Sequence, residues 1–77
     1  MDDVTLRLDA DEALVLFEAM TRWNDSDALD GVLVAGEPTA LWALLAALER
    51  VVVTAADPGH ALLVEQARRR LVLRGGA

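Results

Sequence analysis

The longest uninterrupted run of apolar side chains extends from Ala40 to Leu48, and no charged residue falls between Glu37 and Glu49. Folded as a helix, this run has no broad polar face, and such a helix is buried on most sides by its own domain or by a partner. Along it, one stripe of apolar residues recurs at helical spacing: Leu41, Leu44, Leu45, Leu48 and Val52. We therefore predict that this segment is the central helix and that the other elements pack on it.

Two further segments show helical periodicity. The first begins at Asp9, which stands three residues before Glu12, as the two partners of a capping box do. Its predicted inward stripe comprises Ala13, Leu16, Phe17, Met20 and Trp23. The last helix is predicted to begin with Asp57 as N-cap and Pro58 at its first position. Its predicted inward residues are Ala61, Val64, Ala67 and Leu71.

The segment before the first helix alternates between apolar and polar residues. Val4, Leu6 and Leu8 fall on one face, and Thr5 and Arg7 on the other, which predicts a half-buried β-strand. A strand needs a partner, which could be an internal strand, the same strand of a second subunit or the edge of another protein. Coil docked on the helices is the alternative. The predicted fold is thus mainly α, a compact three-helix bundle preceded by a short N-terminal β-strand, with residues 1–77 forming one domain.

Two β-branched runs are ambiguous. Val32–Val34 lies between two glycines and fits either a strand beside the N-terminal one or an irregular loop, which we slightly favour. Val51–Val53 fits either a fraying helix end or a short extended piece. Gly36 and Pro38 mark the start of the second helix, because proline is tolerated in a first turn.

Composition indicates an interface. A chain of 77 residues buries only about 60% of its unfolded surface, and without cysteines and with a single histidine it has no disulfide or zinc site to add stability. Hydrophobic residues make up 55% of it, more than so small an interior holds, unless alanine inflates the figure. A contiguous apolar patch left on the surface usually marks an interaction site. The residues predicted to form the interface are Leu6, Leu14, Val15, Trp42, Leu45, Val53 and Leu62.

Charge narrows the choice of partner. The net charge is −6, and residues 1–37 hold ten acids but only two arginines. This excess argues against nonspecific nucleic-acid binding, which needs clustered basic side chains, and suits a basic protein. The acidic N-terminus lacks the apolar region of a secretory signal, and the apolar run is shorter than the about 18 residues of a membrane span. We therefore expect a cytoplasmic protein that binds no membrane.

The sequence gives little support for a catalytic or metal-binding site. Counted from Ser26, Asp30 and Glu37 fall at ligand positions of an EF-hand calcium loop, but Ser26 and Ala28 stand where its first acids belong. A solvated acidic loop is the better interpretation. His60, the one histidine, has no nucleophile near it in sequence and is expected to be exposed. The basic cluster of residues 68–70 with Arg74 fits a solvated helix end better than a phosphate site, although it could meet the acids of a neighbouring chain.

These patterns favour a protein that acts by contact. We expect no enzyme activity, and no cofactor, metal or small-molecule substrate. The predicted function is that of a non-catalytic protein-binding module, a small acidic accessory, antitoxin-like or immunity-like protein that masks or assembles with a partner protein. The alternative is a self-assembling structural module, in which the partner is a second copy and the product a homodimer.

Overall fold

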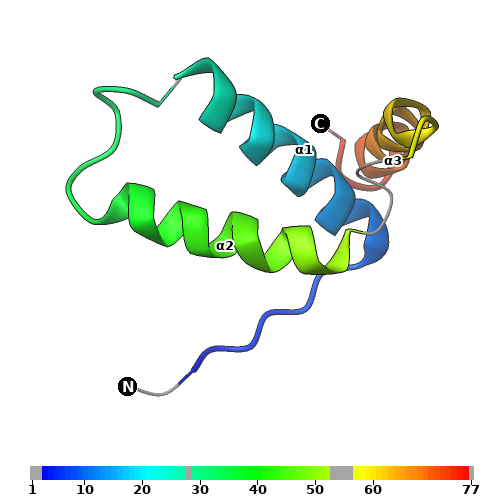
Figure 1. Ribbon diagram of the computed structural model, residues 1–77. Coiled ribbons are helices and arrows are strands. Elements are labelled where there is room, and N and C mark those ends of the chain that lie inside the picture. Colours follow the sequence, from blue (N-terminus) through cyan, green and yellow to red (C-terminus); the bar gives the residue numbers. More distant parts are fainter. Residues whose placement is uncertain (1–2, 28, 53–56, 77) are drawn as a thin grey trace.

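A computed structural model describes residues 3–27, 29–52 and 57–76 of the chain (Figure 1). It contains three helices, α1 (Ala10–Ser26), α2 (Glu37–Val51) and α3 (His60–Gly75), and no β-strand within the described ranges. The prediction of a mainly helical chain with three helices is therefore confirmed.

The central helix is α1. It contacts both α2 and α3, whereas α2 and α3 do not contact each other. Figure 1 shows α2 lying along one side of α1 and α3 on another. The prediction that residues 40–48 form the central helix is thus wrong. The physical reason is side-chain size. Many residues of α2 are alanines, whereas α1 carries large apolar residues on several faces. Every residue of α1 from Asp11 to Thr21 is at least partly buried.

The start of α1 is fixed by local hydrogen bonds, as predicted. The Glu12 backbone N–H donates to Asp9 Oδ1 at 2.8 Å, and the Asp9 N–H donates to Glu12 Oε1 at 3.0 Å. This capping box satisfies backbone donors that the first turn of a helix leaves without a helical partner. The helix ends at Ser26, and the φ of 57° of the next residue, Asp27, lies in the left-handed region.

The other two helices begin differently from each other. Gly36, at φ 90°, precedes α2, and Pro38 lies in its first turn as predicted. The predicted start of α3 is two residues early, because Asp57 is used in a turn. Its Oδ1 accepts from the Gly59 N–H at 2.8 Å, and its carbonyl accepts from the His60 N–H at 2.9 Å. Aspartate often closes such turns through its own side chain, so the helix begins only at His60.

The core is thin. Its buried residues are Phe17 and Met20 of α1, Leu45 and Leu48 of α2, and Val64 and Ala67 of α3. Leu41, Leu44 and Val52 pack against the α1–α2 part of this set, Phe17, Met20, Leu45 and Leu48, so the predicted stripe of α2 is confirmed. Two residues predicted to face inward, Trp23 and Ala61, are instead exposed. Trp23 lies in the last turn of α1, after Met20, the last buried residue of that helix.

The predicted N-terminal strand does not form. Residues 4–8 run extended away from the helices (Figure 1), and their backbone makes no backbone hydrogen bond to the rest of the described chain. The internal strand that could have paired with them is missing, because Val32–Val34 belongs to a series of turns in which the Val32 N–H donates to the Leu29 carbonyl at 3.0 Å. The slightly favoured loop is therefore correct. Val51 ends α2 and Val52 is extended, while Val53 lies outside the described residues.

The fold leaves an unusually large surface. A compact domain of this length has a radius of gyration of about 11.5 Å, whereas this chain has 13.6 Å. A compact monomer of 8.3 kDa exposes about 4,600 Å², whereas this chain exposes 5988 Å². The surplus is roughly 1,400 Å², and the exposed side chains of the N-terminal segment, such as Val4 and Leu6, are part of the exposed surface.

Candidate functional site

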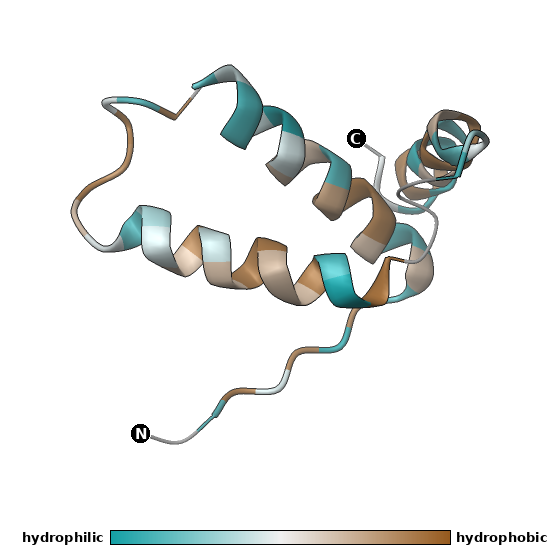
Figure 2. Cartoon of the chain, viewed as in Figure 1, coloured by the Kyte–Doolittle hydropathy of each residue, from teal (hydrophilic) through white to brown (hydrophobic). Residues whose placement is uncertain are grey.

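An apolar groove runs between the N-terminal segment, the start of α1 and the second half of α2. Its volume is about 660 Å³. We call it the N-terminal groove, and its lining residues are Val4, Leu6, Leu8, Asp9, Ala10, Ala13, Leu14, Leu44, Ala47, Leu48, Val51 and Val52. Figure 2 shows hydrophobic residues alternating with hydrophilic ones along the N-terminal segment. Val4 is 84% exposed and Leu6 is 71% exposed, so these side chains bury little apolar surface against the rest of their own chain.

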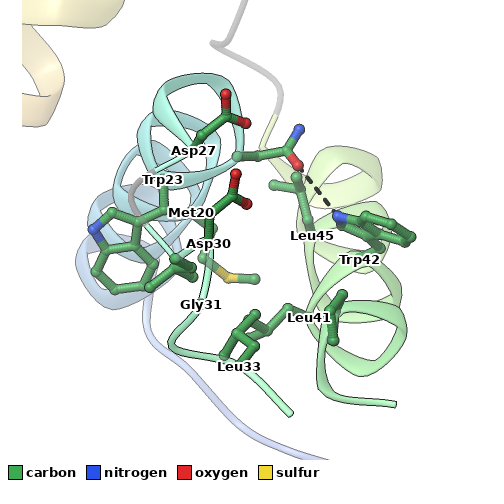
Figure 3. A pocket seen from close by; sticks show the side chains of 12 residues that line it. Met20, Trp23, Asp27, Asp30, Gly31, Leu33, Leu41, Trp42 and Leu45 are labelled. Atoms are coloured by element: carbon green, nitrogen blue, oxygen red, sulfur yellow. Dashed lines mark hydrogen bonds between the residues drawn. The ribbon is translucent and has the colours of Figure 1, made fainter. Parts of the chain in front are cut away.

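A second pocket, the tryptophan pocket, lies at the opposite end of the α1–α2 pair (Figure 3). It has a volume of about 320 Å³. Its lining comes from α1, the following loop and the start of α2, and comprises Met20, Trp23, Asn24, Asp27, Leu29, Asp30, Gly31, Leu33, Pro38, Leu41, Trp42 and Leu45. The Trp42 indole N–H donates to Asn24 Oδ1 at 3.2 Å, which links α2 to α1 across the pocket's edge.

The acidic start of α1 and the basic end of α3 are joined by ion pairs. Arg70 donates two hydrogen bonds to Asp11, and Arg74 contacts both Asp9 and Glu12. The Glu12 backbone N–H and then Arg74 lower the pKa of Asp9, and the hydrogen bond from Arg70 lowers the pKa of Asp11. In turn, the hydrogen bond to Asp11 raises the pKa of Arg70, and the hydrogen bond to Asp9 raises the pKa of Arg74. These arginines therefore serve the contact between α1 and α3.

The rest of the basic cluster is also paired within the chain. Arg69 Nε lies 3.3 Å from Glu65 Oε1, and Arg68 Nη1 lies 4.0 Å from Glu65 Oε2. Exposed pairs of this kind contribute little to stability. They do show that this helix end carries its own counter-charge, which disfavours a focused anion site there.

His60 is half-buried rather than exposed, so that prediction is wrong. Its Nε2 lies 3.4 Å from Glu18 Oε2, and its ring meets the ring of Phe17 edge-on, with centroids 6.3 Å apart. The first turn of α3 faces α1, and this is why the histidine is covered. Within the part of the chain that the structure describes, no three His, Asp or Glu side chains gather as metal ligands would.

The predicted interface residues fall into separate places. Leu6 and the half-buried Leu14 line the N-terminal groove, and Trp42, 57% exposed, lines the tryptophan pocket. Leu45 is only 9% exposed and forms part of the core beneath that pocket. Leu62 is exposed on α3 and lines neither surface, and Val15 is half-buried on α1. Val53 lies outside the described residues, and the interface role of the whole set stays a prediction.

Sequence reasoning missed several lining residues. Val4 and Leu8 share the alternating face of Leu6, so the pattern that named one could have named all three. The acids of the tryptophan pocket, Asp27 and Asp30, belong to the acidic loop that the sequence shows, but their place in the same pocket as Trp42 depends on how that loop folds.

Comparison with known proteins gives no relative: no protein-family model, curated protein or solved structure matches the chain. None of the helices in the described ranges is both long and apolar enough to cross a bilayer.

Proposed function

We propose that this chain is a non-catalytic protein-binding module that assembles with another protein through its N-terminal groove. The observation that carries the proposal is the surplus of roughly 1,400 Å² of exposed surface over a compact monomer of the same mass. A standard protein–protein interface covers about 800 Å² on each partner, so the surplus is large enough to supply one.

The groove offers two kinds of contact to a partner. Most of its lining side chains are aliphatic. When apolar atoms of a partner cover these side chains, the apolar surface of both is removed from water, which favours binding. Beside it, the backbone of residues 3–8 has no ladder partner among the described residues, and an extended segment of a partner could add to it as a neighbouring strand. Backbone hydrogen bonds would then provide affinity, and the alternate side chains Val4, Leu6 and Leu8 would provide specificity.

A second copy of the chain is the alternative partner. In its favour, the alternating face of Val4, Leu6 and Leu8 can meet the same face of another copy, since an isologous contact requires a surface that complements itself. Against it, two chains of net charge −6 repel each other, and this repulsion weakens as salt is added. Self-assembly of this kind would be favoured by high ionic strength.

The proposal assigns the chain no catalytic role and no cofactor, metal, nucleic acid, membrane or small-molecule ligand. It places the protein in the cytoplasm, with which the lack of cysteines is compatible. The masking of a larger partner, as by an accessory, antitoxin-like or immunity-like protein, is the role most in keeping with a small, acidic chain that exposes apolar surface.

The test compares Leu6→Glu with Leu73→Glu by light scattering and by capture of partners from the native host. Both leucines are highly exposed, but only Leu6 lines the groove. We expect Leu6→Glu to abolish assembly and Leu73→Glu to preserve it. A wild-type dimer that Leu6→Glu converts to a monomer identifies self-assembly, and a monomer that loses its captured protein identifies a different partner. Equal behaviour of the two variants would overturn the proposal.

A further inference from the structure

The tryptophan pocket has aromatic and aliphatic walls. Trp23 and Trp42 lie on opposite sides of it (Figure 3), with Met20, Leu41 and Leu45 among the residues between them. The hydrogen bond to Asn24 holds the Trp42 indole in place. Aromatic and aliphatic walls suit methylene groups, and an indole face also attracts a cation that approaches it.

The charged groups that line the pocket are both acids. Asp27 and Asp30 belong to the loop after α1, and no arginine is among the lining residues. The C-terminus of α1 adds a partial negative charge, and its last turn contains no basic residue to balance it. Arg22 comes directly before that turn, is exposed to solvent and does not line the pocket. The partial positive charge at the start of α2 is opposed by Glu37 in its first turn.

The chain's other arginines are used or placed elsewhere. Arg70 and Arg74 pair with the start of α1, and Arg68 and Arg69 pair with Glu65. Two more lie beside the far end of the α1–α2 pair, Arg7 before α1 and Arg50 in the last turn of α2. Within the described chain, the negative potential of the pocket is therefore left for a cation from outside.

The size of the pocket limits what that cation is. A volume of about 320 Å³ is at the small end of the range of ligand sites, about 300–1,000 Å³. It is too small for most cofactors and large enough for one long side chain with its neighbouring backbone. Resting on the proposed function, we infer that the tryptophan pocket receives a lysine or arginine side chain of the protein partner, with its stem between the indoles and its charge at Asp27 and Asp30.

The chain's two tryptophans both line the pocket, so their fluorescence reports on it directly. The first test measures quenching by caesium and by iodide in wild type and in Asp27→Asn/Asp30→Asn. Asparagine tolerates the left-handed φ of Asp27, so the fold should be retained, and circular dichroism checks this. The matched control, Asp3→Asn/Glu49→Gln, removes the same charge from exposed sites outside the pocket.

We expect the ratio of caesium to iodide quenching constants to fall at least about threefold in the pocket variant and to change little in the control. The difference should vanish in about 1 M salt, where the screening length is about 3 Å. Equal ratios for the pocket variant and the control would overturn the inference.

The second test titrates a short synthetic peptide of leucine and lysine, and its counterpart with glutamate in place of lysine. We expect the lysine peptide alone to shift the tryptophan emission, with binding at least about fivefold weaker to Asp27→Asn/Asp30→Asn than to the control. Equal binding of both peptides, or no effect of the aspartate changes, would overturn the inference. Failure of the groove is seen separately, because Leu6→Glu alters assembly without touching the pocket.

Discussion

Arg70 of α3 and Asp11 of α1 form a bidentate ion pair, with Nε 2.7 Å from Oδ2 and Nη2 2.9 Å from Oδ1, although they are 59 residues apart in sequence. This pair places the last turns of α3 against the first turn of α1. The contact between His60 and Glu18 places the start of α3 farther along α1. The two helices therefore run antiparallel, and their charged ends are complementary.

Replacement of Arg70 should loosen the contact between α1 and α3. We expect the midpoint of urea unfolding to decrease in the order wild type, Arg70→Lys, Arg70→Ala, because lysine keeps the charge but loses the planar fork that matches a carboxylate. The decrease should be small, since the pair is exposed to solvent. Arg69→Ala is the control, and a decrease as large as that of Arg70→Ala would contradict the assignment.

Stability should fall in acid. The pKa values of Asp9 and Asp11 are lower in the folded chain than in the unfolded one, so the folded state favours their ionised forms. Their contribution is present above the ordinary aspartate pKa of about 3.9 and is lost as the pH falls through the folded values. Urea midpoints measured from neutral pH down to acid should show this loss. The acid-induced loss of stability should be smaller in Asp11→Asn than in Asp25→Asn. Asp11 forms an ion pair with Arg70, whereas Asp25 forms no ion pair within the described chain.

Core truncation should cost far more than loss of an exposed tryptophan. Phe17→Ala removes a buried ring of α1 that packs in the cluster with α2 and contacts His60 of α3. We expect the free energy of unfolding to decrease by about 3–5 kcal/mol, enough to unfold most of so small a domain. Trp42→Ala should keep the helices, because more than half of this side chain is exposed. Circular dichroism melts of the two variants test these expectations.

Two glycines should respond in opposite directions to alanine. Gly36, at φ 90°, has open space where a Cβ would lie, so Gly36→Ala should lose about 1–2 kcal/mol through backbone strain alone. Gly75 is the last residue of α3 and has neither a positive φ nor a neighbour within reach, so Gly75→Ala should be neutral or gain up to about 1 kcal/mol. Thermal melts would measure both, and a stabilising Gly36→Ala would show that α2 begins differently.

The parts of the fold that could be predicted from sequence are those fixed by neighbouring residues. Asp9 and Glu12 satisfy each other's backbone across one turn, so their spacing is enough to place the start of α1. The start of α3 is predicted two residues early because an aspartate carboxylate can either cap a helix or close a turn. The two structures favour the same residue types, so the sequence does not tell them apart at Asp57. The predicted N-terminal strand is absent because alternation predicts an extended backbone but supplies no partner for it.

The central helix and the pocket depend on tertiary structure. Apolar density favoured residues 40–48, but alanines raise that density without adding much contact area, and α1 offers larger side chains on more than one face. The tryptophan pocket joins Asn24 and Trp42, which are 18 residues apart, through a loop whose course no local pattern records. Leu6, Leu14 and Trp42 could be singled out as surplus apolar residues, but their division between two surfaces could not.

Since α1 alone contacts both other helices, the described chain has two separate seams in place of one shared interior. Each seam can open by itself, so amide hydrogens of α2 and of α3 need not exchange with solvent in the same event. A partner seated in the N-terminal groove bridges α1 and α2 only. Its binding would slow exchange along α2 and leave α3 nearly unchanged, and the protein would thereby gain rigidity in one half of its fold.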